Sequence, residues 1–509
     1  MAEKLRLVDF VAQNDDVSLD DFSDRSQNRI NDALASLTNS GGAPNPGGAG
    51  NIIVSKERDP SEDGIFSEIQ TAIDDSDTNS GDTVYVEPGT YSENVTINKS
   101  NLTLRATGTG ESVIEGRVEA TADGVTLDGF TVSPPPATST FESEAIKVGN
   151  TPNGVTITNN VVDGFERDDP GGSFYGVDGI NVFGGDGSTP IENVTVTNNE
   201  VRGLRNEDTA GVAGISIQGN VDGATVENND LSSLGEGVTS YGFGVTMRTT
   251  DNHGKVPKNV DVLENTISDV QSDSGQLLGV GLGVEADGTN YHFENNDIDS
   301  AGLGVEIKTA AGETTLDNNS FDGTDIHLAD VTGSVDLTSE IGSNDFGKAA
   351  ATDSIVPNSL RPNNLNPYQQ AIFPEIQPAI NVSDTGAQVD VGQGTYDESI
   401  DIDVVDLTLT SIQGSGQTTI EQGIDVQAGG VTVEEFEIRN PGSQGSANPG
   451  SPGGLVGVDV NSGNQDVIVR NNVITDIGTN DDDANPIGVL ASDGTSGITV
   501  DGNEISNLE

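Results

Sequence analysis

Two small groups of aromatic residues stand out in a chain that is otherwise poor in them. Aromatic residues make up 4% of the 509 residues, and Trp is absent. Phe174, Tyr175 and Phe183 lie close together in the segment SFYGVDGINVFGG, and Tyr241 and Phe243 form a second group. Aromatic faces line many ligand sites and can stack on sugar rings. These residues predict glycan binding, with packing of the rings against the rest of the fold as the alternative.

The chain offers few groups for metal or nucleophilic chemistry. The three histidines, His253, His292 and His327, lack the spacing of a metal site. Cys is absent, which excludes thiol chemistry and disulfides. Neither a phosphate-binding G-x-x-x-x-G-K-[ST] motif nor a G-x-S-x-G motif occurs. We therefore expect no cofactor. Structural Ca²⁺, Mg²⁺, K⁺ or Na⁺ on the acidic surface stays open, for example at Asp481, Asp482 and Asp483, a run otherwise typical of a solvated loop.

The charge balance narrows the possible partners. Asp and Glu total 83 and Lys and Arg total 21, so the formal net charge is −62. Such a surface excludes direct binding of nucleic-acid phosphates and disfavours insertion at an anionic membrane. Because cations are few, Arg248 is informative, since Asp251 and His253 follow it closely in VTMRTTDNHGK. Simple charge balance on an acidic surface is the alternative explanation.

The composition also indicates an environment. The chain is rich in acid, poor in Lys and free of Cys, and in this it resembles proteins of extreme halophiles, notably haloarchaea. A calcium-loaded extracellular protein is the alternative, without a supporting calcium-loop motif. Val, Ile and Leu occur in short alternating runs, which predicts a folded chain with its acid at the surface. No apolar run could span a membrane, and the opening residues lack the apolar core of a signal peptide.

Short β-branched strands, most of them followed by an Asn corner, repeat along the chain. The corners are Asn159-Asn160, Asn198-Asn199, Asn228-Asn229, Asn265, Asn295-Asn296 and Asn318-Asn319. Steps of 23 to 39 residues fit one coil of a solenoid, with or without an inserted loop. Asn tolerates a left-handed turn, and Asn side chains at equivalent corners can hydrogen-bond along the axis. The pattern predicts an all-β fold, a right-handed parallel β-helix. The repeats resemble the pectin-lyase-like superfamily over most of residues 65–350.

A longer repeat divides the chain. IFSEIQTAID at residue 65 returns as IFPEIQPAIN at residue 372, and later segments return at offsets of 305 to 312 residues. We therefore expect two tandem β-helix domains, residues 52–350 and 372–509, joined by a linker at 351–371. Residues 1–51 predict a short helical anchor followed by a Gly/Pro linker. The second domain matches only part of the first, so we expect further coils beyond Glu509 or a capping chain.

Two resemblances concern enzymes. GTYSE (89–93) and GTYDE (394–398) resemble the G-x-Y-x-E element of pectin methylesterases, but that family's other motifs are missing. We expect a structural turn into the first coil, with Tyr packing at its end. A looser resemblance to polygalacturonases rests on Asn206-Glu207-Asp208, Asn229-Asp230, Asn252-His253-Gly254 and Glu306-Ile307-Lys308. It implies acid–base hydrolysis, with Asp208, Asp230, His253 and Lys308 as catalytic positions. Glu306 stands where that family has Arg and would repel a uronate, which disfavours an enzyme.

Fold, charge and the tether-like first residues together favour a virion protein. The β-helix resembles the shafts of viral spikes, whose assembly in the host cytoplasm needs no export signal. We expect a capsid turret, tail spike or fibre of a haloarchaeal virus that works in high salt. Its expected partners are other virion proteins through residues 1–51, host glycans or S-layer, and further copies in a trimer or pentamer. The alternatives are a polysaccharide lyase or glycoside hydrolase acting on acidic cell-surface polysaccharide, and a structural β-helix protein of a halophile cell surface.

The net charge generates a first prediction. At −62, self-repulsion should loosen the fold below about half-molar salt, because charges are screened over only about 3 Å in molar salt. Far-UV circular dichroism should therefore lose β signal after dialysis from molar KCl to low salt. An unchanged spectrum would contradict this prediction.

Overall fold

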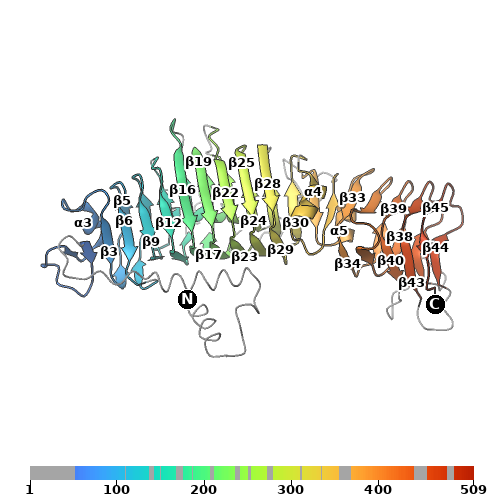
Figure 1. Ribbon diagram of the computed structural model, residues 1–509, viewed down its shortest axis with the longest axis horizontal. Helices are drawn as coiled ribbons and strands as arrows, with labels where there is room; N and C mark the ends of the chain where they lie inside the picture. Colours follow the sequence, from blue (N-terminus) through green and yellow to red (C-terminus); the bar gives the residue numbers. More distant parts are fainter. Residues whose placement is uncertain are drawn as a thin grey trace, which may run out of the picture.

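Short strands stack along one axis and form an elongated rod, with the first coils at one end and the last at the other (Figure 1). The computed structural model describes residues 52–108, 110–136, 143–149, 151–167, 176–185, 187–206, 211–235, 241–249, 254–271, 279–309, 312–333, 335–354, 368–440, 455–478 and 486–508. Consecutive coils pair in parallel and in register, as a parallel β-helix requires. The predicted fold class is therefore confirmed. The predicted anchor, residues 1–51, lies outside the described residues.

Three sheets form the walls of the first unit, which runs from strand β1 (Ile52–Val54) to helix α4 (Leu337–Ser343). The 11-stranded sheet contains β2 (Ile65–Phe66), β1 (Ile52–Val54), β3 (Thr83–Val86), β6 (Thr103–Ala106), β9 (Thr126–Asp128), β12 (Thr156–Thr158), β16 (Ile191–Thr197), β19 (Val221–Glu227), β22 (Lys258–Leu263), β25 (Thr289–Glu294) and β28 (Gly312–Asp317). The 10-stranded sheet contains β29 (Ser320–Asp322), β26 (Asp297–Ala301), β23 (Thr266–Val270), β20 (Asp230–Leu234), β17 (Glu200–Asn206), β13 (Val161–Asp163), β10 (Thr131–Val132), β7 (Ser112–Ile114) and β4 (Gly89–Tyr91), with β14 (Glu166–Arg167) beside β17.

The third wall is a 16-stranded sheet that continues into the second unit. In the first unit it contains β5 (Val95–Ile97), β8 (Val118–Ala120), β11 (Glu144–Val148), β15 (Val177–Phe183), β18 (Val212–Gln218), β21 (Gly242–Arg248), β24 (Val280–Val284), β27 (Leu303–Ile307) and β30 (Ile326–Asp330). Antiparallel pairing through β32 (Gln370–Phe373) and β31 (Ala350–Thr352) then leads to β33 (Gln388–Val391). The ends of the predicted linker, residues 351–371, thus pair within this sheet, whereas residues 355–367 lie outside the described residues.

The second unit repeats the same coil. Its strands in the 16-stranded sheet are β33, β36 (Thr408–Ser411), β39 (Thr432–Glu434), β42 (Ile468–Arg470) and β45 (Thr499–Asp501). Its other walls are β34 (Gly394–Tyr396), β37 (Thr418–Ile420), β40 (Glu437–Asn440), β43 (Val473–Ile477) and β46 (Glu504–Ile505), and β35 (Ile400–Ile402), β38 (Ile424–Val426), β41 (Val456–Val460) and β44 (Ile487–Ala491). In its last described coil, Val500, Ile505 and Leu508 are 42–49% exposed.

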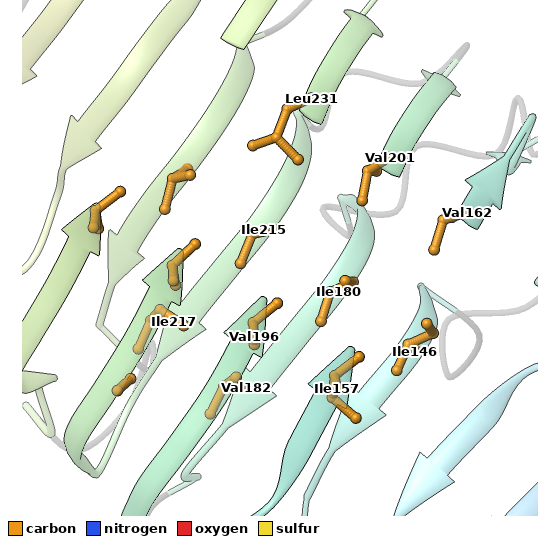
Figure 2. Close-up of a cluster of buried hydrophobic side chains, with 14 of the residues drawn as sticks. Ile146, Ile157, Val162, Ile180, Val182, Val196, Val201, Ile215, Ile217 and Leu231 are labelled. Carbon is orange, nitrogen blue, oxygen red and sulfur yellow. The ribbon is translucent and has the colours of Figure 1, made fainter. Parts of the chain in front are cut away.

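The core is a narrow apolar column inside the coil. Figure 2 shows side chains from all three walls meeting there: Ile157 and Val196, Val162 and Val201, and Ile180 and Ile215. Strands such as β12 and β16 point alternate residues inward, which explains the short β-branched runs of the sequence. Burial of this column supplies the main apolar stabilisation of the rod.

A ladder of Asn side chains, buried except for the half-buried last member, joins the coils at one corner. Its members, one per coil, are Asn160, Asn199, Asn229, Asn265, Asn296, Asn319 and Asn344. The Asn229 Oδ1 accepts from both the backbone N–H and the Nδ2 of Asn199, at 2.9 and 3.0 Å. The Asn before it, Asn228, has φ 54°. The predicted hydrogen bonding along the axis is confirmed, and it fixes the register of successive coils.

The G-T-Y-x-E elements are structural at both places where they occur. The Tyr91 side chain is fully buried, as predicted, and its hydroxyl donates to the Glu87 carbonyl at 2.9 Å. The Glu93 carboxylate accepts from the backbone N–H groups of Ile69 and Gln70, both at 2.8 Å, at the start of helix α3 (Ile69–Asp74). Glu398 does the same for α5 (Ile376–Val382). This Glu is committed to a helix end that the sequence analysis did not predict.

The Asn ladder yields a prediction from two adjacent residues. Asn229→Ala should lower the free energy of unfolding by about 2–4 kcal/mol, because it leaves buried partners on Asn199 and Val196 unpaired. Asn228→Gly is the matched control, since Gly adopts the left-handed turn without strain. It should change stability by less than about 1 kcal/mol. Denaturant unfolding in molar KCl measures both, and equal losses would contradict a special role for the ladder.

The Asn ladder ends against helix α4 (Leu337–Ser343), where Asn344 donates to the Glu340 carboxylate at 3.0 Å. Burial, with Asp317 and Asp336 nearby, raises the pKa of Glu340 to about 7. The folded chain therefore keeps a proton that the unfolded chain releases above about pH 4.5, so stability is lost as the pH rises from 4.5 to 7. Glu340→Gln should remove this loss, so the stability of the variant relative to the wild type should increase as the pH rises through that window. Urea midpoints at pH 5 and pH 8 test this, and a difference independent of pH would contradict it.

Candidate functional site

The outward face of the 16-stranded sheet in the first unit carries the most unusual residues. Five successive strands share a glycine followed by an apolar, a variable and an apolar residue: DGINV, AGISI, FGVTM, VGLGV and LGVEI. A Cβ on Gly179 would lie 2.7 Å from the Gly214 carbonyl oxygen, and one on Gly214 would lie 2.8 Å from that of Gly244. Only glycine fits this column. The residue before it and the second residue after it, such as Asp178 and Asn181, lie on the same outward side, where their side chains hydrogen-bond.

Three neighbouring strands place a polar side chain at the same register position on this face. Asn181 pairs with Ser216, and Ser216 with Thr246. All three are at most 2% exposed, yet Asn181 Oδ1, Ser216 Oγ and Thr246 Oγ1 have no hydrogen-bond partner among the described residues. A buried polar atom without a partner costs about 1–3 kcal/mol. Such a row points to a ligand or to ordered water that completes its hydrogen bonds.

An ion pair crosses this polar row. The Arg248 Nη2 lies 2.6 Å from Asp178 Oδ1, although β18 separates their strands β21 and β15. The guanidinium therefore extends over β18, the strand that carries Ser216. Asn181 donates to the other Asp178 oxygen at 2.8 Å. Burial raises the pKa of Asp178 even though Arg248 opposes it, and burial also raises the pKa of Glu144, its register neighbour.

A cluster of Lys308 and two aromatic rings lies beside the row. Tyr241 and Phe243 stack with centroids 5.7 Å apart, and the Lys308 Nζ lies 4.1 Å from the Tyr241 centroid. The same Nζ lies 2.6 Å from Glu285 and 3.3 Å from Glu306. Burial alone would lower the pKa of Lys308, but the two carboxylates outweigh it and raise that pKa.

Two further contacts hold this cluster in place. Tyr368, from the junction between the units, donates to the fully buried Glu306. Gly283 leaves room for an aromatic ring, because a Cβ there would lie 2.7 Å from the Phe243 ring. On the other side of the row, the Lys147 Nζ lies 5.1 Å from the half-buried Phe183 ring.

The structure brings some predicted residues together and separates others. Tyr241, Phe243 and Lys308 form one cluster, although the sequence analysis assigned them to different hypotheses. Asp230 begins β20 in the 10-stranded sheet, away from Lys308, which follows β27 in the 16-stranded sheet. The remaining predicted residues, Phe174, Tyr175, Asp208, His253, Asp251 and Asp481–Asp483, lie outside the described residues.

Asp178, Asn181, Ser216 and Thr246 were not predicted from the sequence. Their signal was the glycine pattern repeated in five strands, which becomes visible only when the coils are aligned on the glycine rather than on the Asn corner. Arg248 was noticed beside Asp251 and His253. Among the described residues it pairs with Asp178, 70 residues away.

Other features of the described residues limit the chemistry. His292 lies on the 11-stranded sheet, 3.6 Å from Asp261, 3.7 Å from Glu294 and 3.9 Å from Asp317. No group of three or more His, Cys, Asp or Glu is placed to hold a metal ion in the part of the chain that the structure describes. The helices within the same residues are too short or too polar to cross a bilayer.

Comparison with known proteins finds distant similarity. No family model matches the chain. A segment of 101 residues, 19% of the chain, is 35% identical to a cell surface glycoprotein of Methanothermus fervidus. The match spans 16% of that protein, so it concerns a small part of each.

The similar solved structures are parallel β-helix proteins of carbohydrate chemistry. The catalytic domain of a GH87 alpha-1,3-glucanase variant in complex with tetrasaccharides has a TM-score of 0.39 and 14% identity, over 89% of this chain and 70% of that one. A pectin methylesterase from Aspergillus niger has a TM-score of 0.30 and 13% identity, over 57% and 87%. A PL6 alginate lyase in complex with a trisaccharide has a TM-score of 0.29 and 14% identity, over 84% and 80%. None of these similarities transfers a residue role to this chain.

Proposed function

We propose that this chain is a surface protein that binds glycans on the outward face of its 16-stranded sheet. The proposal rests on the polar row of Asn181 Oδ1, Ser216 Oγ and Thr246 Oγ1, which have no hydrogen-bond partner among the described residues, beside the stacked rings of Tyr241 and Phe243. Sugars offer hydroxyl groups for the row and apolar ring faces for stacking. The polar groups repeat at the strand spacing of about 4.8 Å, which suits an extended chain that lies along the rod axis.

The charges on this face favour an uncharged glycan. Lys147, Arg248 and Lys308 lie 2.6–3.6 Å from Glu144, Asp178 and Glu285, respectively. A paired cation has little capacity left for a uronate. Glu306 adds a fourth carboxylate, 3.3 Å from Lys308, so these three cations leave no excess positive charge on the face, and hydroxyl recognition is the chemistry that it favours.

A second candidate is glycan cleavage, which Glu144 and Asp178 favour. Their strands are neighbours, and burial raises the pKa of both carboxyls, as for a general acid. Two neighbouring carboxylates are the machinery of glycoside hydrolysis. The close ion pair of Asp178 with Arg248 weighs against this candidate, because it occupies one of the two groups.

The biological setting is part of the proposal. The segment similar to a cell surface glycoprotein supports a place at a cell surface. The acidic composition and the predicted anchor support the virion appendage of a haloarchaeal virus, attached through residues 1–51 and assembled as a trimer or pentamer. Both settings use the same face for glycan contact. Immunogold labelling of virions and of uninfected cells from the source culture tests which setting applies.

A binding assay tests the proposed function directly. Purified protein in molar KCl is incubated with isolated envelope polysaccharide, and bound protein and released sugar ends are measured together. Tyr241→Ala should weaken binding roughly tenfold, equivalent to about 1.4 kcal/mol. Tyr85→Ala, a partly exposed Tyr on the 11-stranded sheet, is the matched control and should bind as the wild type does.

The same assay distinguishes the two candidates. Binding without released sugar ends is the expected result. Release that disappears in both Glu144→Gln and Asp178→Asn would replace binding by cleavage. Equal binding by the Tyr241→Ala and Tyr85→Ala variants would contradict a glycan site on this face.

A further inference from the structure

The second unit contains two buried aspartates side by side on neighbouring strands, with their side chains on the outward face of the coil. Asp401, Asp425 and Asp459 occupy one register position on β35, β38 and β41. The apolar neighbours of Asp425, Ile424 and Val426, belong to the core, so the carboxylates face outward from the coil. Even so, Asp425 is 5% exposed and Asp459 is 2% exposed. Two buried carboxylates side by side repel each other unless a positive charge or a proton intervenes.

The first unit shows what this position holds elsewhere in the same chain. On β8 and β11, which correspond to β38 and β41 in the order of coils, Glu119 and Lys147 are register neighbours, and the Lys147 ammonium lies 3.6 Å from Glu144. Asp425 therefore corresponds to Glu119, and Asp459 corresponds to Lys147. At this register position the second unit therefore has a carboxylate where the first unit has an ammonium group.

One oxygen of the Asp425 carboxylate has no hydrogen-bond partner among the described residues. Its Oδ2 accepts from the Gln427 Nε2 at 3.1 Å, whereas its Oδ1 is buried and has no partner among the described residues. Burial raises the pKa of Asp425, hydrogen bonds from the Gln427 and Asn461 side chains oppose that rise, and repulsion from Asp401 and Asp459 adds to it. A buried, unpaired carboxylate oxygen next to a second buried carboxylate is a ligand position for a cation.

We propose that a hard cation binds between Asp425 and Asp459 and takes the place of the Lys147 ammonium of the first unit. Oxygen-only ligands select Ca²⁺, Mg²⁺ or an alkali cation rather than a transition metal. Two carboxylates are fewer than a complete metal shell, so water and neutral oxygens fill the remaining positions. This site is independent of the glycan face and lies in the other unit.

The test restores the first unit's arrangement in the second. Ca²⁺ is the probe, and equilibrium dialysis with radioactive Ca²⁺ at constant ionic strength gives the number of ions bound per chain. Asp459→Lys supplies the missing ammonium and should lower that number by one. Asp493→Lys makes the same charge change at an exposed position and should leave the number unchanged. Asp425→Asn is the second variant, should Asp459→Lys fail to fold, and should also lose one ion.

Stability measurements complete the test. The thermal midpoint of the wild type should rise with Ca²⁺ more than that of Asp459→Lys, because a ligand that binds only the folded state stabilises it. If Ca²⁺ has no such effect but KCl or NaCl raises the wild-type midpoint relative to choline chloride, and does not in Asp459→Lys, an alkali cation occupies the site. Equal ion numbers and equal midpoint shifts in the wild type and Asp459→Lys would overturn the proposal, and a proton shared by the two carboxylates would then be the explanation.

Discussion

The buried Asn ladder is the constraint on which the rest of the molecule depends. Each Asn side chain accepts from the backbone N–H and the side-chain amide of the Asn in the previous coil, and donates to a backbone carbonyl of that coil. A shift of one residue in any coil would therefore break several buried hydrogen bonds at once. Register is thereby fixed from coil to coil. Because register is fixed, residues dozens of positions apart along the chain stand one strand spacing apart on the outward faces. Functional side chains on this rod are therefore arranged in rows along its axis.

The outward rows show how one scaffold carries different surfaces. On the first unit's third wall, glycine at one position lets strands approach closely and leaves polar groups and ion pairs on the outside. On the corresponding wall of the second unit, the same register position holds aspartates instead of a carboxylate and an ammonium. The duplication preserved the helix ends capped by Glu93 and Glu398, which the fold needs. The rows of outward-facing side chains differ between the two units.

The sequence predicted the features that repeat locally and missed those that depend on the stacking of coils. The Asn pairs and the alternating apolar runs were sufficient for the β-helix and the ladder, because each signal lies within a few residues. The buried Tyr91 was predicted, whereas helix α3 and its cap by Glu93 were not, because the cap comes from 24 residues away. Asp178 and Ser216 were missed because Asp and Ser are unremarkable until the coils are aligned. The partner of Arg248 was sought nearby in sequence, although a solenoid brings together residues separated by whole coils.

Hydroxyl-radical footprinting with and without envelope polysaccharide tests the central claim most directly, because it locates the contact without any substitution. Bound polysaccharide should protect the partly exposed side chains at the ends of β15, β18 and β21, which are Phe183, Gln218 and Arg248, and the Tyr241 ring. Protection confined to the 11-stranded sheet, or to the strands of the second unit, would contradict the account and place glycan contact elsewhere on the rod.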